Sequence, residues 1–462
     1  MLRATPLLLV VLLSAPTPAV TFEPTAYLND YGASDNGTLS FDYGVAIAEH
    51  DGTWVAVWQA DQLPGTGPEL DSDIAFARSF DGGASWSPAG ILNSQAGSDT
   101  EDDGGPEIAG ASGTWLAVWD RQEGPTAGDS EVWFSRSTND GASWSPMQIL
   151  NTTWATDGFA RDGSPHVAGD GSGTWIVVWT GNNDLGGTIG VDDDVLYARS
   201  TDDGVTWSAP LALNSYAAGD SSDDGPDDFL YDNGVWAVIW ETQEDVGGIG
   251  TDADVVISRS TDDGLSWSVP APVNADATTD TGSDTLPHLA ADEKGRWMAL
   301  WLDNTPQPIG PPHNEASVST STDFGATWSA TIQTGIPPAR PVLAGSRGTW
   351  VIAIYRLHVD SIADYDIFQS QSTDGGQTWT APAILQAEGD GLTDILPVIT
   401  ADDLGRFVLA WQGFDTPGPA GSEPDILYRR TGGVHVPALP FAAATTTALL
   451  VLAAAWRRLR PR

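Results

Sequence analysis

The chain has 462 residues and carries 63 acidic against 19 basic side chains, a formal net charge of −44 at neutral pH. So large a negative charge argues against nucleic acid or an anionic lipid surface as a partner, and it favours a solubilised surface or bound cations. There is no cysteine, which excludes disulfides, thiolate metal sites and a cysteine nucleophile.

The N-terminal residues have the pattern of a cleaved secretory signal. Arg3 precedes the apolar run Leu7 to Leu13, and small residues follow as far as Ala19. We therefore expect residues 1–20 to form a signal peptide, and we expect the rest of the chain to be exported.

An octet of the form Ser-x-Asp-x-Gly-x-x-Trp recurs six times, and its serines are 58, 63, 60, 61 and 51 residues apart. A fixed period of this size is typical of repeat architectures in which each unit buries its apolar faces against its neighbours. Each octet predicts a hairpin turn, in which the third side chain bonds backbone amides and the glycine supplies a positive φ. The third-position residues, which we expect to be structural, are Asp81, Asn139, Asp202, Asp262, Asp323 and Asp374.

Two other segments share this period and occur seven times each. The first is a strand of the type Gly-Thr-Trp-Val-Ala-Val-Trp, apolar on both faces and therefore expected between two sheets. Its copies are 52–58, 113–119, 173–179, 234–240, 295–301, 348–355 and 405–411. The second leads into the octet, at 73–78, 131–136, 194–199, 254–259, 315–320, 366–371 and 425–430. Eighteen of the 21 tryptophans occupy three repeated positions, which predicts that they are core residues.

Each unit therefore reads as four antiparallel strands, with the octet joining the third strand to a short fourth one. The seventh unit lacks its fourth strand at the C-terminal end, but residues 25–29 resemble the outer strands that follow the octets. We predict an all-β, seven-bladed β-propeller over 25–432, closed by an N-terminal strand that completes the blade of residues 395–430. The alternative is a six-bladed ring with one unit outside the circle.

The C-terminal end predicts a membrane-related segment. Residues 433–437 form a linker or sorting motif, 438–456 are long and apolar enough to span a bilayer, and 457–462 are arginine-rich. Together they resemble the tripartite C-terminal sorting signals of Gram-negative bacteria; a permanent single-span anchor is the alternative. We expect the propeller in the periplasm or on the cell surface of a Gram-negative bacterium, with membrane contact only through this segment.

Acidic residues repeat in the loops of one predicted face. The connections from second to third strand end in pairs of acids at i and i+2, and the connections between blades carry further acids such as Asp220 and Asp224. Hard oxygen ligands in this arrangement suit Ca²⁺, the one cofactor that we consider. The alternative is that these acids cap turns and solvate the loops. The candidate calcium ligands are Asp71, Asp73, Asp192, Asp194, Asp252, Asp254, Asp364 and Asp366.

The innermost strands can face a central channel. One equivalent position in successive blades holds Ala46, Glu107, His166, Asp228, His288, Val342 and Val398. Four consecutive blades thus direct titratable groups inward, and Glu107, His166, Asp228 and His288 are our candidate binding residues. The alternative is an ordinary polar, water-filled propeller channel.

Arginines fall into two groups. Five occupy a repeated position on the third strand and are expected to be structural: Arg78, Arg136, Arg199, Arg259 and Arg429. Four others are unique to their blades and lie in loops of the acidic face: Arg121, Arg161, Arg340 and Arg356. These four could grip a carboxylate bidentately; local salt bridges are the alternative.

The octets resemble the Asp box (BNR repeat) of the sialidase, or neuraminidase, superfamily, and with their flanking strands the resemblance covers about residues 40–430. It implies a propeller fold. For activity it implies three arginines on the sugar carboxylate, a tyrosine nucleophile with a glutamate partner, and an aspartate acid/base. No Arg-Ile-Pro motif stands near the first blade, and Tyr355 occupies a slot filled elsewhere by tryptophan. The weak catalytic candidates are therefore Arg121, Arg161, Arg340, Arg356 and Glu107.

Two function classes follow. We favour a surface-associated propeller that binds a glycan or a protein, is stabilised by calcium and is monomeric. The alternative is an exo-α-sialidase-type glycoside hydrolase, so whether the chain is an enzyme stays open.

Overall fold

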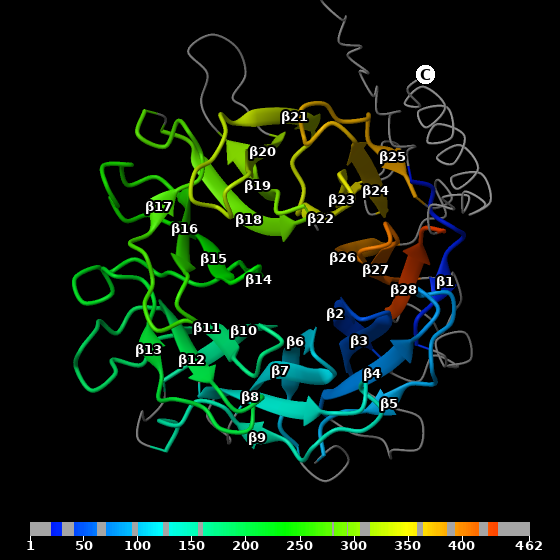
Figure 1. Ribbon diagram of the computed structural model, residues 1–462, viewed down its shortest axis with the longest axis horizontal. Helices are drawn as coiled ribbons and strands as arrows, with labels where there is room; N and C mark the ends of the chain where they lie inside the picture. Colours follow the sequence, from blue (N-terminus) through cyan, green and yellow to red (C-terminus); the bar gives the residue numbers. More distant parts are fainter. Residues whose placement is uncertain are drawn as a thin grey trace, which may run out of the picture.

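The computed structural model describes residues 20–29, 41–61, 71–94, 100–122, 129–155, 160–279, 281–292, 294–304, 315–357, 364–385, 393–414 and 424–432. These residues form seven four-stranded antiparallel sheets, and the sheets stand as blades around one axis (Figure 1). The predicted all-β, seven-bladed propeller is confirmed.

The blades follow one another in chain order, and within each blade the strands run from the axis outward. Blade 1 is β2 (Asp42–His50), β3 (Thr53–Ala60), β4 (Asp73–Ser79) and β5 (Gly90–Ile91). Blade 2 is β6 (Asp103–Ala111), β7 (Thr114–Gln122), β8 (Ser130–Ser137) and β9 (Gln148–Ile149). Blade 3 is β10 (Asp162–Gly169), β11 (Trp175–Gly181), β12 (Asp194–Ser200) and β13 (Leu211–Ala212). Blade 4 is β14 (Asp228–Asp232), β15 (Val235–Thr242), β16 (Asp254–Ser260) and β17 (Ala271–Pro272).

The second half of the ring repeats this plan. Blade 5 is β18 (Ser283–Ala291), β19 (Trp297–Asn304), β20 (Glu315–Ser321) and β21 (Ile332–Ile336). Blade 6 is β22 (Val342–Ser346), β23 (Thr349–Leu357), β24 (Tyr365–Ser372) and β25 (Ala383–Ile384). Blade 7 is β26 (Asp394–Ala401), β27 (Phe407–Gly413), β28 (Asp425–Arg430) and, as its outer strand, β1 (Ala26–Tyr27).

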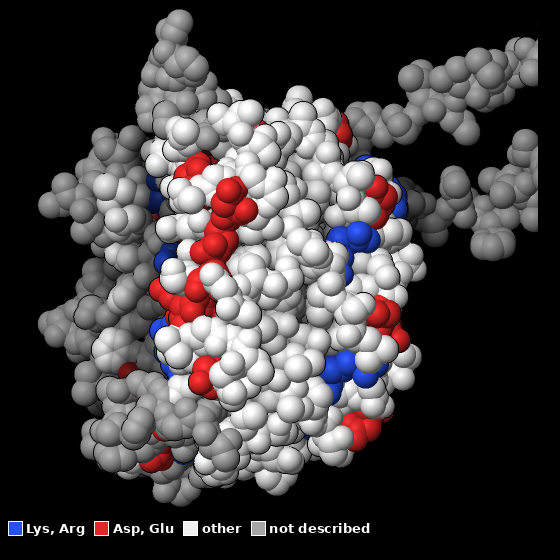
Figure 2. Space-filling view, turned by 90° about the vertical axis from the view of Figure 1, so that its left-hand side faces the viewer, with Lys and Arg blue, Asp and Glu red and all other residues white. Residues whose placement is uncertain are grey.

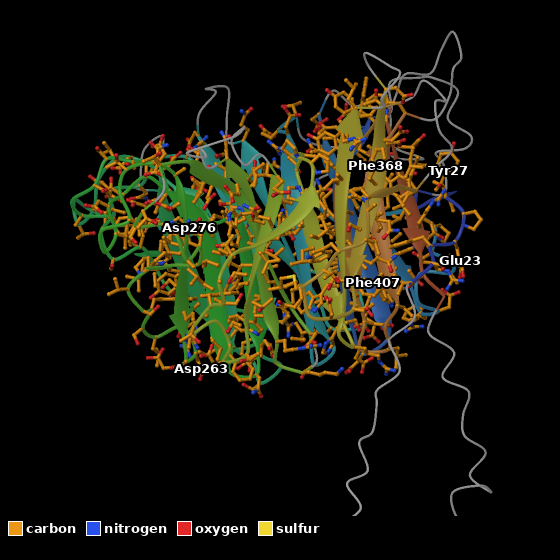
Figure 3. All side chains as sticks on the ribbon, turned by 90° about the horizontal axis from the view of Figure 1, so that it is seen from above. Glu23, Tyr27, Asp263, Asp276, Phe368 and Phe407 are labelled. Carbon is orange, nitrogen blue, oxygen red and sulfur yellow. The ribbon has the colours of Figure 1, made fainter. Side chains whose placement is uncertain are left out.

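The N-terminal strand closes the ring. Ala26 pairs with Tyr428 and Tyr27 with Leu427 in antiparallel register. The Leu28 amide donates to the Ile426 carbonyl at 2.8 Å, which extends the pairing. In Figure 1 β1 lies beside β28, and Figure 3 shows Glu23 and Tyr27 along the outer edge of the same blade. The predicted closure is confirmed, and the six-bladed alternative is wrong.

Tryptophan packing between blades makes the core. The twelve tryptophans of the second strands are each at most 1% exposed. Trp115 and Trp119 of β7, for example, share one cluster with Val55 and Val57 of β3 in the preceding blade. Because both faces of such a strand are apolar, each blade needs a neighbour on either side. Truncating one of these tryptophans to alanine removes contacts of about 3–5 kcal/mol.

The octets form the expected turns. The Asp81 carboxylate accepts from Ser79 Oγ at 2.8 Å, from the Ser85 amide at 2.9 Å and from Ser85 Oγ at 2.6 Å. The same bonds recur around Asp202, Asp262, Asp323 and Asp374. Asn139 makes the same two bonds through its Oδ1, but its Nδ2 donates to Ser143 Oγ. Such donors hold the pKa of Asp262 and that of Asp323 at about 2. Each of these side chains thus holds the turn of its own octet.

The octet tryptophan also reaches the preceding blade. Trp86 packs edge-on against Tyr428 with ring centroids 5.9 Å apart, and Trp144 packs in the same way against Phe76 at 5.8 Å. The repeated arginine works in the other direction, because Arg78 donates to the Asp140 carbonyl in the octet of the next blade. Arg136 and Arg199 make equivalent bonds, so these three third-strand arginines join blades. Arg429 instead donates to Thr25 Oγ1 in its own blade.

An asparagine that ends the outer strand clamps two buried carboxylates. Asn93 Nδ2 donates to Asp73 at 2.5 Å and to Asp103 of the next blade at 2.7 Å, and Trp119 Nε1 also donates to Asp103. Both carboxylates are at most 1% exposed. The clamp recurs at Asn29, Asn151, Asn214 and Asn274. These acids join blades from inside the protein, so the interpretation that they solvate loops is wrong for Asp73, Asp194 and Asp254.

The clamp yields a first prediction. Asn93→Ala leaves two buried carboxylates without their shared donor, so it should lower the free energy of unfolding by at least about 3 kcal/mol. Denaturant unfolding of the full chain measures the effect. Asn304→Ala, which truncates an exposed asparagine at the end of β19, should stay within about 0.5 kcal/mol of the unmodified protein. Equal midpoints for the two variants would contradict a stabilising clamp.

Candidate functional site

A cavity of about 380 Å³ is lined by residues of the innermost strands of the blades. These strands surround the ring axis in Figure 1. The lining of the cavity includes all seven residues that the repeat alignment placed there: Ala46, Glu107, His166, Asp228, His288, Val342 and Val398. Six of them pair in register with the residue just before the last tryptophan of the second strand, as Glu107 does with Val118. Val342 pairs with Ala353, two residues before Tyr355. The residues predicted to face the axis thus line one cavity, and the four candidate binding residues are among them.

Backbone irregularities aim these side chains inward. The pairing of inner with second strand shifts directly before Glu107, His166 and His288, at bulges that re-aim the strand. Gly105 supplies a φ of 55° at the first bulge, and Leu286 adopts 53° at the last. The carboxylate of Glu241 in blade 4 accepts from the Leu286 amide at 2.8 Å and so holds that strained turn.

The cavity has two unlike halves. Blades 2 to 5 contribute Glu107, His166, Asp228 and His288 to its wall, while blades 6, 7 and 1 contribute Val342, Val398 and Ala46. Titratable groups therefore face aliphatic ones across the axis at this position, and a ligand would meet the titratable groups on one side only.

Asp228 and His288 form the charged centre of the polar half. His288 Nδ1 lies 3.5 Å from Asp228 Oδ2, which also accepts from the Leu289 amide at 2.9 Å. Burial raises the pKa of Asp228, but the hydrogen bond and charge of His288, with the charge of His166, outweigh it. The net pKa is below the usual range, so Asp228 is ionised at neutral pH.

Glu107 has the opposite protonation. Burial, followed by the nearby charge of Asp228, raises the pKa of Glu107 to about 8. Burial lowers the pKa of His166. At neutral pH the cavity wall thus carries a protonated Glu107, which can donate, beside an ionised Asp228, which accepts. Carboxyl groups driven to opposite protonation states in one cavity are typical of binding and catalytic sites.

The repeat alignment missed a further acid here. Asp227 also lines the cavity, and burial, with the charge of Glu241 next, raises its pKa to about 7. Its Oδ2 accepts from the Glu241 amide at 3.1 Å. The adjacent pair Asp227-Asp228 was the available signal, but alternation along a strand assigns only one of the two to the axis.

The four unique arginines do not line this cavity. Arg121 is buried and pairs with Glu101 at 3.1 Å and Asp103 at 3.3 Å, so it belongs to the blade junction. Arg161 pairs with Asp193, Arg356 lies over the Phe368 ring at 4.7 Å, and Arg340 is exposed. The structure thus gives three of them separate local partners in different blades.

One group of acids could hold a metal ion. Carboxylate oxygens of Asp192, Asp194 and Asp220 lie within 4.8 Å of one another at the junction of blades 3 and 4. Burial, then the Asn214 donor and the neighbouring carboxylates, leave the pKa of Asp194 at about 7; burial also raises the pKa of Asp220, to about 6. Of the other candidates, Asp71, Asp73, Asp252, Asp254, Asp364 and Asp366 join no such group among the described residues. The residues equivalent to Asp220 in those repeats, Asp99, Asp280 and Asp390, lie outside the described part.

Comparison with known proteins supports the fold alone. No protein-family model matches the chain, and no curated protein does. Among solved structures, an ulvan lyase from a new family of polysaccharide lyases gives a TM-score of 0.52 at 13% identity, over 87% of this chain and 94% of that one. A Dyadobacter fermentans protein of unknown function gives 0.49 at 16% identity, over 90% and 100% of the two chains.

Sialidases are also among the similar structures. The Hadza microbial sialidase matches with a TM-score of 0.45 at 16% identity, over 84% of this chain and 65% of that one. The fold similarity rests on the ulvan lyase comparison together with the six octets, whose hydrogen bonds the structure shows. The chain therefore shares its fold with the ulvan lyase, and its octets form the turns that their resemblance to Asp boxes implies. The ulvan lyase is a polysaccharide lyase, as its name states.

The predicted signal peptide (1–20) falls almost wholly outside the described residues, and the linker, apolar segment and arginine tail (433–462) fall entirely outside them. Within the described part, no helix is both long and apolar enough to cross a bilayer.

The raised pKa of Glu107 predicts a pH-dependent stability. A carboxyl whose pKa is near 8 when folded and near 4.5 when unfolded destabilises the fold progressively as pH rises from about 4.5 to about 8. Glu107→Gln removes this loss, so its Tm should match that of the unmodified protein near pH 4.5 and exceed it by at least about 2 °C at pH 8.5.

The control is Asp263→Asn, which removes an exposed carboxylate on the octet face (Figure 3). Its Tm difference from the unmodified protein should not grow with pH. A Glu107→Gln difference that is equally independent of pH would contradict a protonated Glu107.

Proposed function

We propose that the protein is an exported glycan-binding module whose ligand site is the axial cavity. The observation that carries the proposal is the division of this cavity into a polar and an aliphatic half. A sugar ring has hydroxyl groups at its edge and C–H groups on its faces, so it can use both halves at once. The volume, about 380 Å³, is at the lower end of the range for small-molecule sites and suits one terminal sugar unit.

The charge of the cavity favours an uncharged or amino sugar. No arginine or lysine is among the residues that line it in the described part of the chain, and Asp228 is ionised. A sugar carboxylate would therefore enter a negative site without a cation to pair with it. The similar ulvan lyase has been solved with a -[GlcA(1-4)Rha3S]- unit. We propose that this chain also binds a carbohydrate, but one without an acidic sugar.

The alternative, an exo-α-sialidase-type hydrolase, has less support. It needs three arginines on one carboxylate, whereas Arg121 and Arg161 are paired elsewhere and Arg356 lies over Phe368. What favours an enzyme is the opposite protonation of Glu107 and Asp228, the arrangement of a general acid beside a second carboxylate. A binding module requires neither the three arginines nor a general acid beside a second carboxylate.

Binding of uncharged sugars tests the proposal. We expect soluble hexose and N-acetylhexosamine oligomers to bind by calorimetry at pH 7, and 3′-sialyllactose and glucuronate oligomers not to bind. Glu107→Ala should weaken binding about tenfold, because one hydrogen bond in the cavity is lost. Glu107→Gln should retain it, since an amide also donates. Affinity of the unmodified protein should fall as pH rises through about 8, where Glu107 ionises, but affinity of Glu107→Gln should not.

Arg161→Ala, on the rim, is the control and should bind normally. If no uncharged sugar binds, or if Glu107→Ala binds as tightly as the unmodified protein, the proposal fails. Turnover of a fluorogenic sialoside that disappears in Arg161→Ala or Arg340→Ala would instead support the hydrolase.

Export and surface association are part of the proposal and rest on sequence. We propose that residues 1–20 are removed and that 433–462 either anchor the chain or are cleaved at the cell surface. N-terminal sequencing of protein from fractionated cells should find a mature start near residue 21 in the envelope or the medium. Full-length protein in the cytosol would contradict export.

A further inference from the structure

Two loops are fastened together at the rim between blades 3 and 4. Residues 182–193 connect β11 to β12, and residues 213–227 connect β13 to β14 of the next blade. The Gly190 amide donates to the Ala217 carbonyl at 2.9 Å, and the Asp224 amide donates to the Asp193 carbonyl at 2.7 Å. Backbone hydrogen bonds thus fasten the two loops together, and the Asp193 amide adds a bond to Asp223 Oδ1 at 3.3 Å.

Three carboxylates converge in this junction. Oxygens of Asp192, Asp194 and Asp220 lie within 4.8 Å of one another. Asp194 is fully buried; its Oδ1 accepts from Asn214 Nδ2 at 2.7 Å. Its Oδ2 has no hydrogen-bond partner among the described residues, and neither do Asp192 Oδ2 and both oxygens of Asp220. Buried carboxylate oxygens without donors are costly, so the junction lacks a positive partner.

The protein supplies no such partner from a side chain that the structure describes. Arg161, the arginine that reaches this rim, pairs with Asp193 and not with the three acids. Figure 2 shows acidic side chains in a band along the face opposite the octets, over this side of the ring; on the octet side acidic and basic groups alternate. A free cation approaching the rim is therefore attracted by its surroundings.

We propose that Asp192, Asp194 and Asp220 bind one Ca²⁺ ion, which ties blade 3 to blade 4. Oxygen ligands of Ca²⁺ lie at about 2.3–2.6 Å, so two ligands of one ion can be up to about 5 Å apart. The three oxygens lie within 4.8 Å of one another, which fits this span. Mg²⁺ demands near-ideal octahedral geometry and usually keeps several waters with only one or two carboxylates, so three converging carboxylates suit Ca²⁺ better. The set is all carboxylate oxygen, as hard cations prefer, and leaves positions for water or backbone carbonyls.

Two features adapt the junction to an ion. Asp194 contributes one oxygen to the asparagine clamp and the other to the proposed site, so the ion would extend an existing link between blades. Gly190 leaves space for Asp192, since a Cβ there would lie 2.1 Å from Asp192 Oδ1. The site is on the rim, and its test is independent of sugar binding in the axial cavity.

The first test counts bound ions. The full chain is stripped with chelator, dialysed against Ca²⁺ and assayed for metal by mass spectrometry. Asp220→Asn should bind one Ca²⁺ fewer per chain than the unmodified protein, whatever other sites the chain has. The control Asp263→Asn removes the same charge from the octet face and should bind the same number. Equal stoichiometry in Asp220→Asn and the unmodified protein would overturn the proposal.

The second test is the sign of the stability change. In chelator, Asp220→Asn should melt at the same temperature as the unmodified protein or higher, because one of three mutually repelling carboxylates is gone. In 5 mM Ca²⁺ the order should reverse by at least about 3 °C, since only the intact site gains from binding. A variant that is less stable in both solutions would show a purely structural acid and overturn the proposal. An equal rise of Tm with Mg²⁺ would overturn the assignment to calcium.

Discussion

The structure depends on one constraint: the second strand of every blade is apolar on both faces. A sheet of this kind cannot end at solvent, so each blade must lie between two others. Only a closed ring satisfies this for all seven, and the N-terminal strand β1 provides the closure by pairing with β28. Closure also brings one residue from each inner strand to the axis, where Glu107, His166, Asp228 and His288 share a cavity. The candidate site is thus a consequence of the packing between blades.

Acidic residues have three separate roles in this ring. In the octets they accept hydrogen bonds from backbone and hydroxyl donors and hold turns, as Asp81 does. At blade junctions they are buried beneath an asparagine and a tryptophan, as Asp103 is. On the axis they are buried close together, which raises the pKa of Glu107, and at the junction of blades 3 and 4 several of their oxygens lack donors; we propose that ligand and ion binding use their charge at these two places. The acidic residues behind the net charge of −44 are therefore placed at turns, blade junctions and candidate sites, and solubility is not their single role.

The resemblance to sialidases concerns the scaffold. The octets lie on the face away from the acidic loops, and their hydrogen bonds are local. They therefore stabilise the propeller scaffold whatever chemistry the loops or the axial cavity perform. An arginine triad would have to come from loops of several blades. Here Arg121 serves a blade junction and Arg161 an adjacent loop, which leaves the axial cavity without a cation in its described lining. The proposed recognition of an uncharged sugar by protonated and ionised carboxyls is consistent with a lining that has no cation.

Much of this fold was predictable because its signals are local and repeated. The octets predicted the turns, and the apolar faces of the tryptophan strands predicted the buried sheets. The number of repeated segments predicted seven blades and their closure by the N-terminal strand. The axial positions were also predictable, because the same position in each inner strand lies at a similar distance from the ring axis. What the sequence alone could not decide depends on distances between blades. The sharing of Asp73 and Asp103 by Asn93, the convergence of Asp220 on Asp192 and Asp194, and the proton on Glu107 all arise from neighbours far apart in the chain. Repetition determines what each blade is; only packing around the axis determines which charges meet, because burial and Coulomb forces act through space.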